Sequence, residues 1–384
     1  MRRIFLSLSG VLLAVLGYLL FWPVPIAPVA WEAPDSPGFV GVFARNERLS
    51  GFELVPTDDQ HGPEAMAVDA EGRLYAATET GWIVRLDSTG ANPTRWVNTT
   101  GRPLGMAFDR SGTLWVADGL RGLLAISPAG DVRVAARTTS AGDTIRYADD
   151  LDVARDGRVY FSDATTKFYP PKWGGLDASV LEILEHRGHG RLLEHDPATG
   201  RTEELTGGLV FANGVSLTHD ETGVLVNETG SYRVLLVERD GPGRGAVRPF
   251  IDALPGFPDN IKRGANGRYW LSLISPRNAL VDQLAGQPFL RKAVRRLPAF
   301  VRPAPVNYGH LVALDTTGRV VESLQDPSGG YPMLTSVLEV RGWLYLGSLA
   351  APTAARLRWT PDDTAGMVDT VGMVDTVGMV DTPN

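Results

Sequence analysis

Phe257-Pro258-Asp259-Asn260-Ile261 places an acid and an amide between a proline and an apolar run. Each of several similar stretches has an oxygen-bearing side chain just ahead of a strand-like segment. They are Gly62-Pro63-Glu64-Ala65, Tyr147-Ala148-Asp149-Asp150-Leu151 and Phe211-Ala212-Asn213-Gly214-Val215. A turn of the Asp-x-x-Gly kind and a second apolar strand follow each of them. The recurrence indicates that one supersecondary unit is used repeatedly.

The second halves of these units can be aligned six times along the chain. They begin at Asp69, Asp109, Asp156, Asp220, Asn266 and Arg341. Outer strands are expected at Trp82–Leu86, Gly122–Ile126, Arg191–His195, Arg233–Glu238, His310–Leu314 and Ala355–Trp359. Units of about four strands in roughly 40–50 residues are typical of propeller blades, because small sheets bury both faces only when they pack around a ring. The sequence therefore predicts an all-β, six-bladed β-propeller over residues 42–360, with Val42–Pro56 supplying the outermost strand of the last blade.

Two blades carry insertions with helical character. Residues 165–190 contain a predicted helix at Asp177–Glu185, and residues 276–309 contain apolar residues at helical spacing. The second insertion also carries Arg291, Lys292, Arg295 and Arg296. We expect amphipathic helices packed on the propeller; a lid over the central cleft and a basic membrane-facing helix are the alternatives.

The two ends of the chain differ in composition from the middle. Residues 1–22 are almost entirely apolar after Arg2 and Arg3, which predicts an uncleaved transmembrane signal anchor. The arginines predict a cytoplasmic amino terminus and a single-pass protein whose propeller lies on the periplasmic, extracellular or lumenal side; a cleaved signal peptide is the alternative. Residues 23–41 are proline-rich and predict a linker. Residues 361–384 repeat Gly-Met-Val-Asp-Thr-Val and predict a low-complexity, disordered tail.

Composition excludes several functions. With 37 basic and 44 acidic residues the chain carries a net charge of −7, which argues against nucleic-acid binding. The absence of cysteine excludes disulfides, thiol nucleophiles and cysteine-ligated zinc. None of the six histidines forms an H-E-x-x-H pattern. We expect His186 and His189, in the first insertion, to be solvated.

The start of each innermost strand of a propeller lies near the axis at one end of the ring. Side chains at this position in four different blades are therefore expected to converge. They are Glu64, Asp149, Asn213, Asp259 and Asn260. Carboxylate and amide oxygens suit a hard cation, and Ca²⁺ best, since it takes about 6–8 oxygen ligands. Asp150 would add either a second, deeper cation or a buried hydrogen bond.

The units beginning at Gly101, Asp149, Gly190, Ala212, Gly256 and Leu344 resemble the strictosidine synthase-like family. The run Gly256-Phe257-Pro258-Asp259-Asn260-Ile261 is the most specific part of a resemblance that extends from about Gly51 to Trp359. Paraoxonases and the SMP-30/gluconolactonase group are related propellers. The resemblance implies a calcium ion at the axis, and the ligand positions of the lactonases and paraoxonases match Glu64, Asn213, Asp259 and Asn260.

The resemblance also carries departures from the family pattern. Asp149 stands where paraoxonases have asparagine, and Leu104 stands where they have a histidine. Asp150 matches a ligand of their structural calcium, whereas Ala65 stands where a second such ligand would be. Thr335 stands at the position of the glutamate that strictosidine synthases use for condensation. The family's usual disulfide is missing.

These observations favour a calcium-dependent hydrolase of small-molecule esters or lactones. Asp259 and Glu64 are the expected catalytic residues, with Asp259 helping to deprotonate the attacking water beside the ion. A membrane-tethered binding propeller with a structural calcium is the second hypothesis, because fold does not determine function. A condensing enzyme is the third hypothesis, which Thr335 disfavours.

Overall fold

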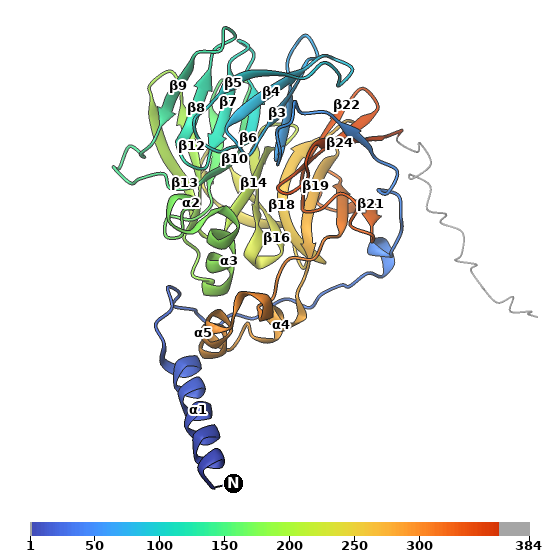
Figure 1. Ribbon diagram of the computed structural model, residues 1–384. Coiled ribbons are helices and arrows are strands. Elements are labelled where there is room, and N and C mark those ends of the chain that lie inside the picture. Colours follow the sequence, from blue (N-terminus) through green and yellow to red (C-terminus); the bar gives the residue numbers. More distant parts are fainter. Residues whose placement is uncertain (1, 361–384) are drawn as a thin grey trace, which may run out of the picture.

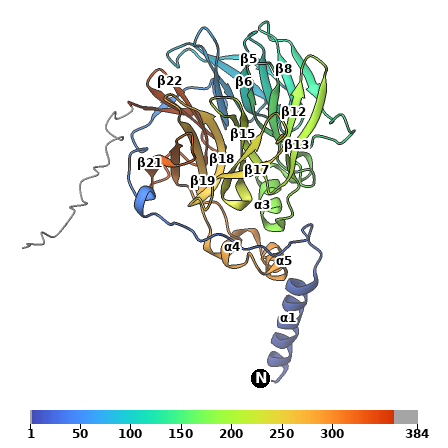
Figure 2. The same ribbon diagram turned by 180° about the vertical axis from the view of Figure 1, so that it is seen from behind.

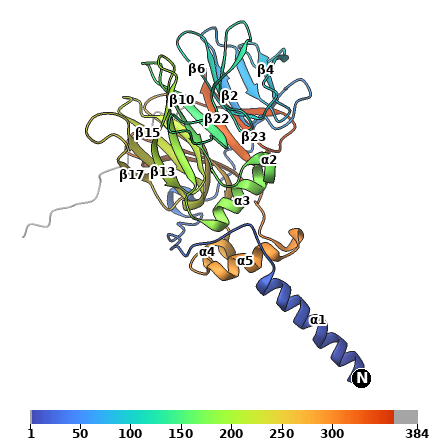
Figure 3. The ribbon, with the colours of Figure 1, turned by 90° about the vertical axis from the view of Figure 1, so that its left-hand side faces the viewer.

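Six antiparallel sheets of four strands each stand around a common axis (Figures 1 and 3). The computed structural model describes residues 2–360 and, within them, the side chains of residue 10 and of residues 12–360. The predicted tail, residues 361–384, lies outside the described residues. The innermost strand of each sheet contacts the innermost strands of both neighbouring sheets. The ring is therefore closed, and the predicted six-bladed β-propeller is confirmed.

Each blade is numbered from the axis outward. The first three blades consist of β2 (Ala65–Val68), β3 (Leu74–Ala77), β4 (Trp82–Leu86) and β5 (Thr94–Asn98); β6 (Pro103–Phe108), β7 (Leu114–Asp118), β8 (Gly122–Ile126) and β9 (Val132–Ala136); and β10 (Ala148–Val153), β11 (Val159–Asp163), β12 (Gly190–Asp196) and β13 (Arg201–Leu209). The next two consist of β14 (Ala212–Leu217), β15 (Gly223–Glu228), β16 (Arg233–Glu238) and β17 (Val247–Ile251); and β18 (Gly256–Arg263), β19 (Tyr269–Pro276), β20 (Gly309–Leu314) and β21 (Val320–Asp326). The last consists of β22 (Leu334–Val340), β23 (Trp343–Ser348), β24 (Ala354–Arg358) and β1 (Glu53–Val55).

The last blade joins the two ends of the propeller chain. Strand β1 pairs antiparallel with β24, so that Glu53 lies opposite Arg356. The predicted contribution of Val42–Pro56 to the outer edge of this blade is confirmed. This pairing closes the ring through backbone hydrogen bonds, which leaves no unpaired gap between the first and last blades.

The repeated Asp-x-x-Gly turns have a clear physical basis. Gly112 has a φ of 82°, a conformation that glycine adopts without steric cost. The Asp109 carboxylate accepts the backbone N–H groups of Ser111 at 2.8 Å and Thr113 at 2.9 Å. It also accepts the indole N–H of Trp115 at 3.0 Å, which ties the turn to the next strand. Aspartates of this kind are therefore structural.

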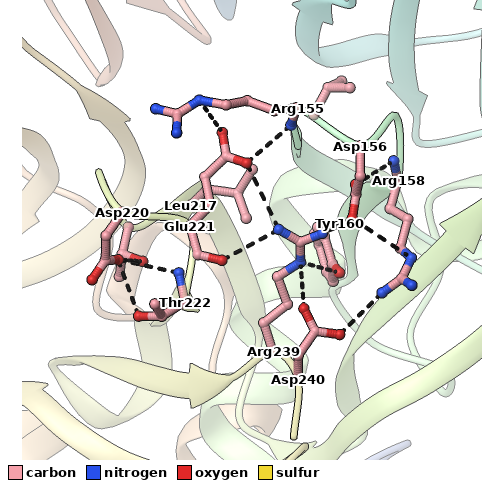
Figure 4. Close-up of polar contacts among 12 residues, drawn as sticks. Arg155, Asp156, Arg158, Tyr160, Leu217, Asp220, Glu221, Thr222, Arg239 and Asp240 are labelled. Carbon is pink, nitrogen blue, oxygen red and sulfur yellow. Dashed lines mark hydrogen bonds and ion pairs between the residues drawn. The ribbon is translucent and has the colours of Figure 1, made fainter.

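An ion-pair network joins the third and fourth blades (Figure 4). Arg239 is only 6% exposed; its guanidinium donates to the Tyr160 hydroxyl at 2.7 Å and pairs with Asp156 and Glu221. Asp156 follows β10 and Glu221 precedes β15. The network therefore lies at the turns between the innermost and second strands, at the end of the ring opposite the starts of the innermost strands.

The helices lie outside the ring of sheets. They are α1 (Arg2–Phe21), η1 (Gly41–Phe43), α2 (Pro170–Trp173), α3 (Gly175–Glu185), η2 (Thr229–Ser231), α4 (Ala279–Gln283), α5 (Pro288–Arg296) and η3 (Ala299–Val301). Helices α3, α4 and α5 gather at the end of the propeller nearest α1, as both views show (Figures 1 and 2). Among the residues that the structure describes, no helix has the length and apolar character required to cross a bilayer.

The linker, residues 23–41, packs between the two insertions. The Val29 N–H donates to the carbonyl of Glu185 at 3.0 Å, and the Trp31 N–H donates to that of Ala285 at 3.2 Å. Arg291 is 1% exposed and donates to the carbonyls of Leu184 at 2.9 Å, Ala285 at 3.0 Å and Val29. This arginine therefore holds α3, α4 and the linker together, which favours packed cover over a basic membrane-facing helix.

We expect Arg291→Ala to lower the free energy of unfolding by about 2–4 kcal/mol, because it leaves buried carbonyl groups without a donor. The midpoint of urea unfolding measures this change. Lys292→Ala is the matched control, since Lys292 is the next residue of α5 and is only half-buried. Equal midpoints for the two variants would contradict the role assigned to Arg291.

Candidate functional site

The five residues predicted to converge lie at the starts of innermost strands, as expected. Glu64 directly precedes β2, Asp149 lies in β10, Asn213 in β14, and Asp259 and Asn260 in β18. All five are buried, with 4% or less of each residue exposed. Residues this polar are rarely buried to such an extent unless they are paired or bind a ligand.

Register shifts occur in the innermost strands at these positions. In β10 the pairing with β11 is interrupted between Ala148 and Leu151, which brackets Asp149. The same irregularity brackets Asn213 in β14 and the Asp259-Asn260 pair in β18. An extra residue in a strand re-aims its side chains, and such bulges are over-represented beside active sites.

Two glycines allow the innermost strands to approach each other closely. A Cβ atom on Gly105 would lie 2.3 Å from the Asp150 carboxylate, and one on Gly214 would lie 2.5 Å from the Asp259 carbonyl. Real Cβ contacts are never this short, so any side chain at either position would push two blades apart. Glycine is therefore required here because the ring is narrow at the site.

The three carboxyl groups lie close enough to shift each other's pKa. Burial raises the pKa of Glu64 to about 7, the Arg102 guanidinium lowers it, and the Asp150 charge raises it. Burial also raises the pKa of Asp149 well above its usual value, and the charges of Glu64 and Asp259 add to the effect. The pKa of Asp259 is raised in the same way, by burial and then by Glu64. The three groups therefore share one region of repelling negative charge.

The donor set fits a hard cation by its chemistry. Within the described residues, the Oδ1 atoms of Asn213 and Asn260 are buried and have no hydrogen-bond partner. Buried acceptors are nearly always satisfied, so such exceptions need an explanation, and carbonyl and carboxylate oxygens are what Ca²⁺ binds. In the same part of the chain, however, no three acidic, histidine or cysteine side chains lie within coordinating reach of one point. The fit therefore rests on orphaned oxygens and charge.

Two residues of the site carried no signal in the sequence. Arg102, which directly precedes β6, donates to the Glu64 carboxylate at 3.0 Å and to the Gly62 carbonyl at 3.2 Å. Tyr147 is buried beside the acids, and its pKa is raised well above 10 by burial and then by the charge of Asp149. Its hydroxyl therefore keeps its proton. Both residues act across blades, which a repeat pattern within one blade does not reveal.

Thr335 occupies the site without an acid function. It is fully buried, and its hydroxyl donates to the Glu64 carbonyl at 2.8 Å. Ser336 donates to the same oxygen at 2.6 Å. These two hydroxyls hold the backbone of Glu64 in place, so Thr335 has a positioning role in this chain.

Both insertions rise from the end of the ring that holds the site. Ala148, at the start of β10, pairs with Asp163, at the end of β11, after which the chain enters α2 and α3. Likewise Gly256 pairs with Pro276, after which the chain enters α4 and α5. The site therefore faces the helical cover and the side of the molecule from which α1 extends (Figure 1).

The linker contributes a residue to an apolar cluster beside the site. Ile26 is 3% exposed and belongs to one buried cluster with Leu104, Tyr147, Phe168 and Phe211. Tyr147 links this cluster to the acids: burial raises its pKa, and the charges of Asp149 and Glu64 raise it further. Ile26 therefore packs in the apolar cluster that adjoins the acids through Tyr147.

We expect Ile26→Asp to release the linker from this cluster. Burial of an isoleucine side chain is worth about 1.5–3 kcal/mol, so local opening should become roughly tenfold more frequent or greater. Limited proteolysis of the linker measures the opening, with cleavage faster by the same factor. Val40→Asp is the matched control, because Val40 lies in the same linker and is 68% exposed. Equal cleavage rates would show that Ile26 does not hold the linker down.

The expectation that His186 and His189 are solvated is wrong. The His186 ring stacks on Trp31, with centroids 3.8 Å apart, and burial lowers its pKa to about 3. The His189 ring lies 3.0 Å from the carboxylate of Glu182, which is fully buried. The first insertion uses both rings for packing because helix α3 folds back onto the linker.

Family models and relatives agree with this architecture. A model described as strictosidine synthase-like, N-terminal, matches residues 41–86, and one described as strictosidine synthase matches residues 149–237. The chain is 33% identical to adipocyte plasma membrane-associated protein of Bos taurus over 382 residues, which cover 93% of this chain and 90% of that protein. It is 29% identical to the strictosidine synthase-like 10 protein of Arabidopsis thaliana, covering 87% of this chain and 96% of that protein.

Solved structures share the fold at low sequence identity. A gluconolactonase from Xanthomonas campestris superposes with a TM-score of 0.59 at 18% identity, over 87% of this chain and 98% of its own. Regucalcin from Agrobacterium tumefaciens gives a TM-score of 0.55 at 13% identity, over 80% and 93% respectively. On the family models and the curated relatives, this chain belongs to the strictosidine synthase-like family.

Proposed function

We propose that this protein is a calcium-dependent hydrolase of esters or lactones. One observation carries the proposal: three buried carboxyl groups and two buried, unpartnered amide oxygens occupy the start of the innermost strands. They are Glu64, Asp149, Asp259, Asn213 and Asn260. A divalent cation would neutralise the acids and satisfy the amides at the same time. When bound, it would supply a Lewis acid for the substrate carbonyl.

The chain's own residues supply the remaining chemistry. Asp259 is the group we assign to take a proton from the attacking water, because it is a buried carboxylate among the residues that would hold the ion. Tyr147 keeps its proton because of its raised pKa, so its hydroxyl is a donor for a developing oxyanion. Leu104, Phe168 and Phe211 form a buried apolar cluster with Tyr147, which would keep water away from that hydroxyl.

The family membership and the shared fold accord with this proposal. Among proteins with the same fold, one is described as a gluconolactonase and another as a calcium-binding protein. The experiment is a screen of lactones and aryl esters with the full-length chain in detergent, with Ca²⁺ or with EDTA. Turnover that requires Ca²⁺ is expected. Equal rates in EDTA would exclude the calcium-dependent mechanism.

A membrane-tethered binding propeller is the second candidate. Two contacts favour it: Ile26 of the linker packs in the apolar cluster of Tyr147, and Arg102 already engages the Glu64 carboxylate at 3.0 Å. In that case the ion would only stabilise the fold. Chelation would then lower the melting temperature of a protein that turns over none of the screened substrates. The condensing enzyme stays disfavoured, because the Thr335 hydroxyl donates to a backbone carbonyl and cannot replace an acid.

We also propose that residues 1–22 anchor the protein, with the propeller on the non-cytoplasmic side. The apolar run and its preceding arginines support this topology, as does the similarity to adipocyte plasma membrane-associated proteins. Alkaline carbonate extraction should leave the full chain in the membrane fraction. A chain that begins at residue 23 should be released, and retention of that shorter chain would contradict the anchor.

A further inference from the structure

A partly buried lysine, Lys262, contacts Asp150, the acid next to the candidate ligand Asp149. The Lys262 ammonium lies 2.6 Å from Asp150 Oδ1 and 2.9 Å from the Leu151 carbonyl oxygen. The other carboxylate oxygen of Asp150 accepts the backbone N–H of Val215 at 2.9 Å. The Asp150 side chain is fully buried and that of Lys262 is 15% exposed. Asp150 is therefore satisfied by donors from two other blades.

This contact connects the strands that carry the candidate ligands. Asp150 adjoins Asp149 in β10, and Val215 lies two residues after Asn213 in β14. Lys262 lies two residues after Asn260 in β18. Asp150, with its partners Lys262 and Val215, therefore links the third, fourth and fifth blades within two residues of their candidate ligands.

The net charge of the site matches one divalent ion. The site holds four buried carboxyl groups, and two basic side chains, Arg102 and Lys262, pair with two of them at 3.0 Å and 2.6 Å. The acids are Glu64, Asp149, Asp150 and Asp259. Two negative charges remain, which equals the charge of one Ca²⁺. Without Lys262, three negative charges would remain, and Asp150 would be a buried carboxylate with no counter-charge.

We propose that the Lys262 ammonium takes the place of a second cation beside Asp150, so that the chain binds one divalent ion and not two. The proposal rests on the ion site of the proposed function, but not on the reaction. Lys262 is a positioning residue in this arrangement: it acts on the ligands through Asp150 and the three strands that Asp150 joins.

The test is calorimetric titration of the full-length chain with Ca²⁺, which reads stoichiometry independently of turnover. Wild type is expected to bind one ion. Lys262→Ala is expected to bind two, because the Asp150 carboxylate and the Leu151 carbonyl become available to the second. Arg263→Met is the matched control: Arg263 is the next residue and pairs with Asp152 at 3.0 Å, not with Asp150. It should bind one ion with an affinity within about threefold of wild type.

A charge series keeps the proposal testable if Lys262→Ala fails to fold. Asp150→Asn leaves one negative charge at the site and is expected to weaken Ca²⁺ binding at least about tenfold. Asp150→Asn combined with Lys262→Met restores two negative charges and should return the affinity to within about threefold of wild type. Failure of the double variant to restore binding would overturn the proposal.

The remaining outcomes separate this proposal from the hydrolase. If wild type binds two ions, or if Lys262→Ala binds one ion, the role proposed for Lys262 is overturned and the hydrolase proposal is not. One ion bound by wild type without turnover of any ester or lactone overturns the hydrolase alone. No ion bound by wild type overturns both.

Discussion

Asp259→Ala is expected to reduce calcium-dependent ester or lactone turnover at least about 100–1000-fold, the loss typical of removing one group that stabilises or activates the reacting atoms. Asp259 is 4% exposed, and its pKa is raised by burial and by Glu64. It is the only residue to which we assign both cation binding and proton transfer. Initial rates with a lactone or aryl ester at saturating Ca²⁺ measure the loss.

Two further variants of this prediction separate chemistry from folding. Asp259→Asn keeps the shape of the side chain and loses its charge, so its turnover should fall to the same low level. Asp252→Asn is the matched control, because Asp252 lies seven residues earlier and is exposed. It should retain wild-type rates. Wild-type turnover by Asp259→Ala would show that the reaction takes place elsewhere.

The thermal stability of the calcium-free protein is expected to fall as pH rises from about 5 to 8. Glu64 has a pKa raised from 4.5 to about 7, and the pKa values of Asp149 and Asp259 are raised further above their usual value. The folded chain therefore holds protons that the unfolded chain has released. This stabilisation is complete below the unfolded pKa values and is lost as pH rises through the folded ones. Each retained proton costs about 1.4 kcal/mol per pH unit.

Calcium should remove this pH dependence. A ligand at about 100 times its Kd stabilises the folded state by about 2.7 kcal/mol, and the gain should be larger at pH 8, where protons no longer compete with the ion. Differential scanning calorimetry in EDTA and in Ca²⁺ measures both effects. Asp259→Asn should flatten the slope in EDTA, since it removes one of the repelling carboxylates. A wild-type melting temperature in EDTA that rises toward pH 8 would contradict the buried acidic cluster.

The fold followed from local patterns in the sequence. Trp82–Leu86, Gly122–Ile126 and Arg233–Glu238 coincide with β4, β8 and β16, because each is a short apolar run bounded by turn residues, such as Gly81 before β4 and Asp87 after it. The fourth strand of most blades carried no such signal. In β5, for example, Thr94 and Arg95 are exposed and the burial pattern does not alternate cleanly.

The position of the site was also readable from the repeat, since residues at equivalent places in a ring face the same axis. The sequence by itself determined the six blades and the burial of Glu64, Asp149, Asn213, Asp259 and Asn260 at one end of the axis. The tertiary structure alone decided that Arg102 engages Glu64, that Lys262 engages Asp150, and that Ile26 packs in the cluster of Tyr147. The physical reason is the sequence separation of the interacting residues, because turn chemistry and strand patterning act over only a few residues. A contact such as that of Lys262 with Asp150 joins side chains 112 positions apart and exists only once the ring has closed.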